Sequence, residues 1–210
     1  MTLLTILLSV LTTLTGGIFR TTYSTEVKAE ASECNVVIDT LISQLQQDPQ
    51  LLSDWAFAGL GKQSDSEKNA IYLVWKDAEY SPEKKYSKLL LDVHVDEKPK
   101  FKDVVIESQV DDTMEVKNRV IRVDIFYSGS LLDKAYGIFR IEPQADGTTV
   151  MAIETDIQFG WFFRIFVTKR IFSKNIDWRL ERFVQNLKLT AEGQRPTDAY
   201  WQAIDNATTN

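Results

Sequence analysis

The spacing of hydrophobic residues changes twice along this chain. Apolar and polar residues alternate over much of the range 70–157, whereas apolar residues recur every three or four positions before and after it. Alternation places apolar side chains on one face of a strand, and the longer spacing places them on one side of a helix. The chain therefore predicts an early helical region, a run of strands and a C-terminal helix.

Seven segments have the strand pattern. In the range 119–127, for example, Ile121, Val123 and Ile125 share one face, and the charged residues Arg122 and Asp124 lie on the other. The last six are joined by short connections, one of them the hairpin signal Asp146-Gly147, so neighbours should pair antiparallel. The predicted strands are Tyr23–Ala31, Ala70–Lys76, Leu89–Val95, Phe101–Val110, Arg119–Tyr127, Lys134–Glu142 and Thr148–Ile157.

The early helical region follows the first strand directly. Ser32 is the N-cap candidate, and the helix should end at Asp48-Pro49, because proline disfavours helix in the residue before it. A second short helix is predicted over Gln50–Trp55, followed by a loop that contains Gly59-Leu60-Gly61.

The C-terminal pattern predicts one long helix over Trp161–Leu189. No proline interrupts this range, and Gly160 and Gly193 flank it. Such a helix must be covered, and the preceding strands are the available cover. Its apolar stripe consists of Ile165, Phe172, Ile176, Leu180, Phe183 and Leu187.

The N-terminal segment Met1–Phe19 carries no charged side chain. Its length is borderline for a span, which takes about 20 apolar residues. We interpret residues 1–20 as a single-pass membrane anchor; a cleaved signal, giving a secreted or periplasmic protein, and a soluble buried helix are the alternatives. The remaining chain divides into one domain over residues 21–192 and a polar tail over residues 193–210.

Composition narrows the possible functions. The 210 residues are 44% hydrophobic, enough for a sizeable core, and the net charge of -6 without a basic stripe argues against nucleic-acid binding. The single cysteine, Cys34, is expected as a small apolar residue in a helix. No Gly-rich phosphate loop or Gly-x-Ser-x-Gly motif occurs, and no cofactor is predicted.

Two groups of polar residues are candidates for a metal site or a catalytic site. His94 lies between Asp92 and Asp96 on one strand, but residues two apart on a strand are roughly 6.6 Å apart, too far to bind one metal ion together, so a solvated face is expected and no metal site is predicted. Glu154 and Asp156 share a face that should be the outer one, so acid–base catalysis is not expected there.

The order of elements resembles the START-like superfamily, also called SRPBCC or Bet v 1-like, and especially its polyketide cyclase/dehydrase-like members. Three local similarities support this: residues 27–32 leading into a helix, Trp55 after the second short helix, and residues 146–150 followed by a helix that closes at 183–188. Gly59-Leu60-Gly61 is a poor counterpart of the family's glycine-rich stretch. The resemblance implies an α+β helix-grip fold, in which a curved antiparallel sheet of about six or seven strands surrounds a long C-terminal helix.

The resemblance also implies a cavity between sheet and helix. The inward strand faces are largely apolar, and the small residues Ala135 and Gly137 could leave space for a hydrophobic guest, although a filled core fits the same pattern. Candidate cavity residues are Trp75, Val123, Tyr127, Phe139, Met151, Ile153, Thr155, Ile176 and Leu180.

Aromatic and basic residues gather where the C-terminal helix should begin. Such a mixture suits a membrane interface, whereas the alternative places the aromatics in the core and the bases in water. The membrane-contact candidates are Trp161, Phe162, Phe163, Arg164, Lys169 and Arg170.

Three functions remain open. The first is a membrane-tethered domain that binds a hydrophobic or lipid-like small molecule, the second a cyclase/dehydrase-like enzyme using the same cavity, and the third a structural or interaction module. The sequence offers no matched set of catalytic groups, which favours binding over catalysis. It does not determine the oligomeric state.

Overall fold

A computed structural model of the chain describes residues 18–47, 71–95, 98–164, 167–173 and 177–194. Over these residues, seven strands form one antiparallel sheet in the order β1-β7-β6-β5-β4-β3-β2. The first strand therefore pairs with the last. The strands are β1 (Ile18–Val27), β2 (Ile71–Ser81), β3 (Tyr86–Val95), β4 (Lys98–Glu115), β5 (Asn118–Tyr127), β6 (Leu132–Pro143) and β7 (Thr149–Phe159).

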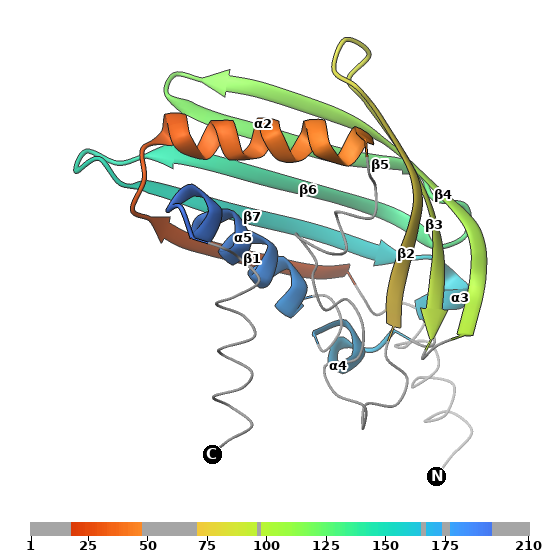
Figure 1. Cartoon of the computed structure of the whole chain (residues 1–210). Coiled ribbons are helices and arrows are strands. Elements are labelled where there is room, and N and C mark those ends of the chain that lie inside the picture. Colours follow the sequence, from red (N-terminus) through yellow and green to blue (C-terminus); the bar gives the residue numbers. More distant parts are fainter. Residues whose placement is uncertain (1–17, 48–70, 96–97, 165–166, 174–176, 195–210) are drawn as a thin grey trace.

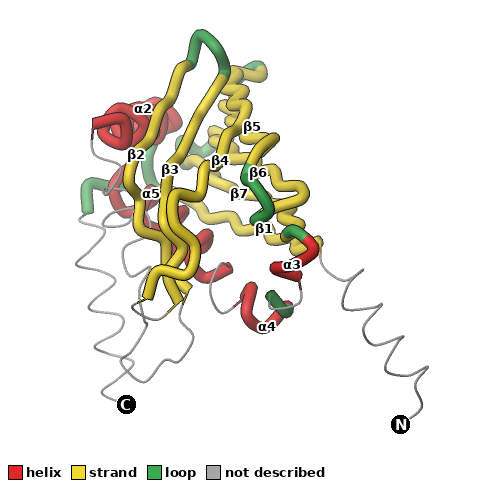
Figure 2. Tube along the Cα trace, turned by 90° about the vertical axis from the view of Figure 1, so that its right-hand side faces the viewer, coloured by secondary structure: helices red, strands yellow, loops and turns green. Residues whose placement is uncertain are grey.

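Two long helices lie side by side on one face of this curved sheet (Figure 1). Helix α2 (Ala31–Gln47) packs on β6, and helix α5 (Trp178–Ala191) packs on β1, β7 and α2. Two four-residue helices, α3 (Trp161–Arg164) and α4 (Lys169–Phe172), lie near the end of the sheet where β7 finishes (Figure 2). This arrangement confirms the predicted helix-grip fold.

The hydrophobic core lies between α2, α5 and the middle of the sheet. Met151, Val184 and Leu187 are completely buried in it. Cys34 also belongs to this core, as expected, and burial raises the pKa of its thiol, which favours the neutral form. The cluster consists of Val27, Ala29, Cys34, Ile38, Leu41, Phe139, Ile141, Met151, Ile153, Val184 and Leu187.

The predicted bounds of the first strand were wrong. It begins at Ile18 rather than Tyr23, because Ile18 and the residues after it pair with β7, and it ends at Val27 rather than Ala31. The backbone turns after Val27, where the Lys28 N–H donates to Glu192 Oε1 at 2.8 Å.

The predicted N-cap of α2 was also wrong. The Glu30 carbonyl accepts from the backbone N–H groups of Glu33 and Cys34, and Glu33 Oε2 accepts from the Glu30 N–H at 3.0 Å. Glu30, not Ser32, therefore begins the helix with a reciprocal capping interaction.

The single helix predicted over Trp161–Leu189 is wrong as well. The described residues form α3, α4 and α5, and Val167 and Thr168 are not helical. Ile165, Val167 and Thr168 are β-branched, and this cluster lowers helix propensity at the break. The flanking signals hold: α3 starts after Gly160, and Gly193 has a positive φ of 72° just beyond α5.

Several predicted segments lie outside the described residues: residues 1–17 of the proposed anchor, the short helix Gln50–Trp55, Gly59-Leu60-Gly61, most of the polar tail, and Ile165, Phe166 and Ile176. Ile18, Phe19 and Arg20, assigned to the N-terminal segment, belong to β1. None of the described helices combines the length and apolar character needed to cross a membrane.

Candidate functional site

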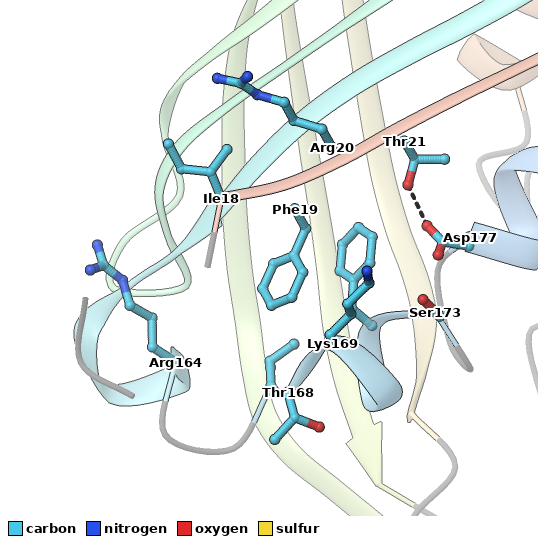
Figure 3. A pocket seen from close by; sticks show the side chains of 11 residues that line it. Ile18, Phe19, Arg20, Thr21, Arg164, Thr168, Lys169, Ser173 and Asp177 are labelled. Atoms are coloured by element: carbon cyan, nitrogen blue, oxygen red, sulfur yellow. Dashed lines mark hydrogen bonds between the residues drawn. The ribbon is translucent and has the colours of Figure 1, made fainter. Parts of the chain in front are cut away.

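A pocket of about 600 Å³ opens between the start of β1 and the helices that follow β7 (Figure 3). Residues from both ends of the domain meet there, because β1 pairs with β7 along their whole length. Its lining consists of Ile18, Phe19, Arg20, Thr21, Arg164, Val167, Thr168, Lys169, Phe172, Ser173 and Asp177. We call this space the β1–α4 pocket.

Stacked aromatic rings form one wall of the β1–α4 pocket. The ring of Phe19 lies 4.5 Å from that of Phe172, with planes only 10° apart, and Phe159 meets both rings edge-on. Phe159 and Phe172 are buried, so this wall is held from behind by the protein. Such a wall offers a fixed apolar surface to a guest.

Cationic side chains line the same pocket. The Arg20 Nε donates to Asp156 Oδ2 at 3.1 Å, and the Arg164 Nε donates to the Phe159 carbonyl at 2.7 Å. Lys169 is exposed and lines the same pocket (Figure 3). Asp177 is the single carboxylate in the lining, and Asp156 and Asp133, which are outside the lining, pair with Arg20 and Arg164.

Asp177 has a structural contact within the pocket. Its carboxylate accepts a hydrogen bond from the hydroxyl of Thr21, which ties the residue before α5 to β1. This contact fixes the side of the pocket opposite Arg164 (Figure 3).

A close backbone approach positions α3 at the end of β7. The Gly160 N–H donates to the Leu131 carbonyl at 3.0 Å, and a Cβ placed on Gly160 would lie 2.1 Å from the Ser130 carbonyl oxygen. Only glycine allows this approach. The chain therefore turns into α3 directly against the β5–β6 connection.

A second hollow of about 420 Å³ lies on the other side of α3. It is bounded by residues 100–105 of β4, residues 127–131 and Phe163. The rings of Phe101 and Phe163 are 4.8 Å apart at 60°, so α3 is packed against β4. Tyr127 lines this hollow and is 50% exposed.

The structure does not bring the predicted cavity residues together around one space. Phe139, Met151 and Ile153 belong to the packed core, with Leu180 against it. Val123 and Trp75 are half-buried. Among the described residues, the buried Oγ1 of Thr155 and Nε1 of Trp75 have no hydrogen-bond partner. Tyr127 lies at the second hollow, and Ile176 is outside the described residues.

The membrane-contact candidates divide into two groups. Trp161 and Phe162 are 67% and 43% exposed, so for these two the core interpretation is wrong. Phe163 packs on Phe101, and Arg164 is held by the Phe159 carbonyl and Asp133. The remaining candidates, Lys169 and Arg170, are exposed on α4.

Asp92, one of the candidate metal ligands, makes structural contacts instead. Asp92 was expected on a solvated face but is 8% exposed, because Lys76 Nζ lies 2.7 Å from its Oδ1 and the Asp103 N–H donates to it. These contacts, that of Lys76 first, hold the pKa of Asp92 below its ordinary value. Asp96 is outside the described residues, and within the described part no three His, Cys, Asp or Glu side chains are placed to share a metal ion.

The Glu154 and Asp156 pair is also engaged. Glu154 accepts from Arg140 at 3.4 Å, and Asp156 pairs with Arg20. Asp156 lies on the face opposite the core but is only 4% exposed, between its cross-strand partners Arg20 and Tyr136. The prediction that these two residues lie on the outer face of the sheet was right, but Asp156 is not exposed to solvent there.

Sequence reasoning identified Arg164 and Lys169 but missed most of the β1–α4 pocket. Ile18 and Phe19 were assigned to an anchor, and Asp177 was not singled out. Their proximity depends on the β1–β7 pairing across the whole domain, which no local pattern states. One usable signal was the β-branched cluster near residue 167, which lies between α3 and α4.

Neither a scan against protein-family models nor a search of curated proteins found a match. Solved structures do share the fold. A conserved protein from Geobacillus kaustophilus is 14% identical, with 83% of this chain and 96% of that chain covered and a TM-score of 0.50.

Two further structures are similar. A START superfamily protein from Mycobacterium smegmatis is 17% identical over 83% of this chain and 97% of its own, with a TM-score of 0.46. The Zhui aromatase/cyclase from Streptomyces sp. R1128 is 14% identical over 84% and 94%, with a TM-score of 0.47. At these identities the likeness concerns the fold alone, and the helix-grip fold implied by the resemblance is what the sheet and helices of this chain confirm.

Proposed function

We propose that this domain binds a small amphipathic molecule with an apolar body and an anionic head in the β1–α4 pocket. The observation that carries the proposal is the composition of that pocket, in which a buried aromatic wall stands beside Arg20, Arg164 and Lys169. A volume of about 600 Å³ lies within the range of roughly 300–1,000 Å³ typical of small-molecule sites.

Lys169 is the cation best suited to meet the anionic head. Arg20 and Arg164 already bind Asp156 and Asp133, whereas no ion pair of Lys169 is found within the described part of the chain. The apolar body would lie along Phe19 and Phe172, where its burial is favourable by about 25 cal/mol per Å².

The test uses the full chain and cis-parinaric acid, a fluorescent fatty acid. We expect saturable binding with one site, and we expect Val167→Trp to abolish it, because the indole would fill the pocket. Lys169→Ala should weaken the acid about two- to fivefold and leave the methyl ester of the probe unaffected, since an exposed charge pair contributes below about 1 kcal/mol. Lys117→Ala, at the far β4–β5 turn, is the matched control.

Circular dichroism checks that the Val167→Trp variant remains folded. Equal binding by the wild type and by a folded Val167→Trp variant would contradict the proposal. If Lys169→Ala changes the affinity for neither the acid nor the ester, the proposal that the ligand has an anionic head is wrong.

A second candidate function, a cyclase/dehydrase-like enzyme, is favoured by one observation only. Asp177 places a carboxylate in the lining of the β1–α4 pocket, where it could act as an acid or base. The Asp177 carboxylate already accepts a hydrogen bond from the Thr21 hydroxyl, and the position of Asp177 before α5 gives this contact a structural role. The described lining adds no further carboxylate, histidine, cysteine or tyrosine, so binding without chemistry accounts better for the site.

A further inference from the structure

Helix α3 presents two large aromatic side chains to solvent. Trp161 and Phe162 are 67% and 43% exposed, and their rings meet edge-on with centroids 6.0 Å apart. Exposed apolar surface that is contiguous and rimmed by polar residues commonly marks an interaction site.

The rest of α3 holds these two rings rigidly. Phe163 contacts both Phe162, at 5.5 Å between ring centroids, and Phe101 of β4. Arg164 is fixed by the Phe159 carbonyl and by Asp133. Because Gly160 locks the start of the helix against Ser130, the aromatic pair projects from a fixed turn.

Exposed cations lie on two elements beside α3, helix α4 and strand β4. Lys169 and Arg170 are exposed on α4, and Lys100 and Lys102 are exposed on either side of Phe101. This concentration is opposite in sign to the net charge of -6 of the chain. We call Trp161, Phe162 and these four cations the α3 patch.

The start of the described chain lies at the same end of the molecule. Ile18 is 50% exposed and lines the β1–α4 pocket together with Arg164 and Lys169. The residues that precede it, 1–17, are all uncharged in the sequence.

We propose that the α3 patch docks on the surface of an anionic lipid bilayer. Trp161 and Phe162 would lie among the headgroups, where an aromatic ring can keep an apolar body in lipid and a polar edge in water. The four cations would contact lipid phosphates, each contributing about 1 kcal/mol near such a surface. This inference concerns where the domain sits and does not depend on what the β1–α4 pocket holds.

The decisive experiment follows Trp161 itself in the full chain. Vesicles of equimolar phosphatidylcholine and phosphatidylglycerol are prepared with brominated phosphatidylcholine, which quenches tryptophan on contact. The chain has five tryptophans, so the Trp161→Phe variant supplies the difference spectrum. We expect quenching in the wild type that Trp161→Phe loses while still binding the vesicles. This readout holds whether or not residues 1–17 also enter the bilayer.

The cation part is tested by vesicle sedimentation. Lys169→Gln with Arg170→Gln should weaken binding to the anionic vesicles about 25-fold, or about fivefold per cation. Lys84→Gln with Lys117→Gln, in turns at the far end of the sheet, is the matched control and should bind as the wild type does. If tight insertion of the N-terminal segment hides the change in partition, loss of Trp161 quenching in the Gln variant is the supporting result.

Two results would overturn the proposal. Equal quenching in the wild type and Trp161→Phe would show that Trp161 does not reach lipid. A blue-shifted, unquenched Trp161 would show that another part of this chain or a second copy covers the patch.

Discussion

The two ends of the β1–β7 pair are covered in opposite ways. Near Val27 and Thr149, both fully buried, α2 and α5 close over the sheet and leave a packed core. Near Ile18 and Gln158, two four-residue helices lie over the strands, and a pocket of about 600 Å³ remains.

The difference follows from helix length. A helix of 17 residues, such as α2, presents several turns of apolar side chains and can bury them against a sheet. A four-residue helix such as α4 presents about one turn; its Phe172 is buried, whereas Lys169 and Arg170 are exposed. The β1–α4 pocket therefore lies where the C-terminal helical region is divided into short helices.

Met151→Ala should test the packed end with the largest effect. Met151 is completely buried, and its truncation should lower the free energy of unfolding by about 2–5 kcal/mol, because a cavity is left behind. Val167→Ala at the pocket end should cost less than about 1 kcal/mol, since Val167 already borders empty space. Urea denaturation measures both, and similar costs would mean that the two ends are equally packed.

Gly160→Ala should come next and act on the junction between the ends. The added Cβ would meet the Ser130 carbonyl at 2.1 Å, and the forced shift should cost about 1–3 kcal/mol. Gly137→Ala is the control, because its Cβ would have nothing nearer than 3.9 Å. Thermal unfolding of the two variants side by side gives the answer; a Gly160→Ala protein as stable as the control would contradict the close approach.

Arg119→Met, at the packed end, should lower the free energy of unfolding by about 1–2 kcal/mol. Arg119 is 9% exposed and binds Asp112 at 2.6 Å and Asp39 of α2 at 2.7 Å, and these carboxylates, Asp112 first, raise its pKa. The cost stays modest because Asp39 is largely exposed. Arg122→Met breaks the exposed pair with Asp124 and should change stability by less than about 1 kcal/mol in the same denaturation series.

The smallest expected effect is a change in how the stability of the protein falls at acidic pH. The folded protein holds the pKa of Asp92 below 3.8, so its contribution to stability is present above that value and is lost as the pH falls through the folded pKa. Asp92→Asn should therefore lose less stability than the wild type between about pH 5 and pH 3. Parallel acid limbs in the two urea-midpoint profiles would show that the Lys76 contact does not act in this way.

The strands were predictable because one face of each is buried. In β7, Thr149, Met151 and Ile153 alternate with less buried residues, and period two follows directly from the pleat. The turn at Asp146-Gly147 was equally readable, since Gly147 has a φ of 86° and Asp146 accepts from the Thr148 N–H.

The site was less predictable because it depends on contacts across the whole chain. The predicted stripe from Ile165 to Leu187 had a helical spacing, but spacing does not report a break, and Val167 and Thr168 interrupt the helix locally. The uncharged run before Arg20 concealed the strand that begins at Ile18, because apolar strands and apolar helices look alike over a few residues.

Strand β4 is longer than its neighbour β5, and this has a consequence for solubility. Pairing with β5 covers only Glu107–Glu115, so within the described strands one edge of residues 98–106 carries unpaired backbone groups. Such an edge can recruit a strand from another molecule and start aggregation. Pro99, which lacks an N–H, and the charges of Lys98, Lys100 and Lys102 disfavour that pairing, so these residues should limit aggregation through this edge, and Lys100 and Lys102 also belong to the α3 patch.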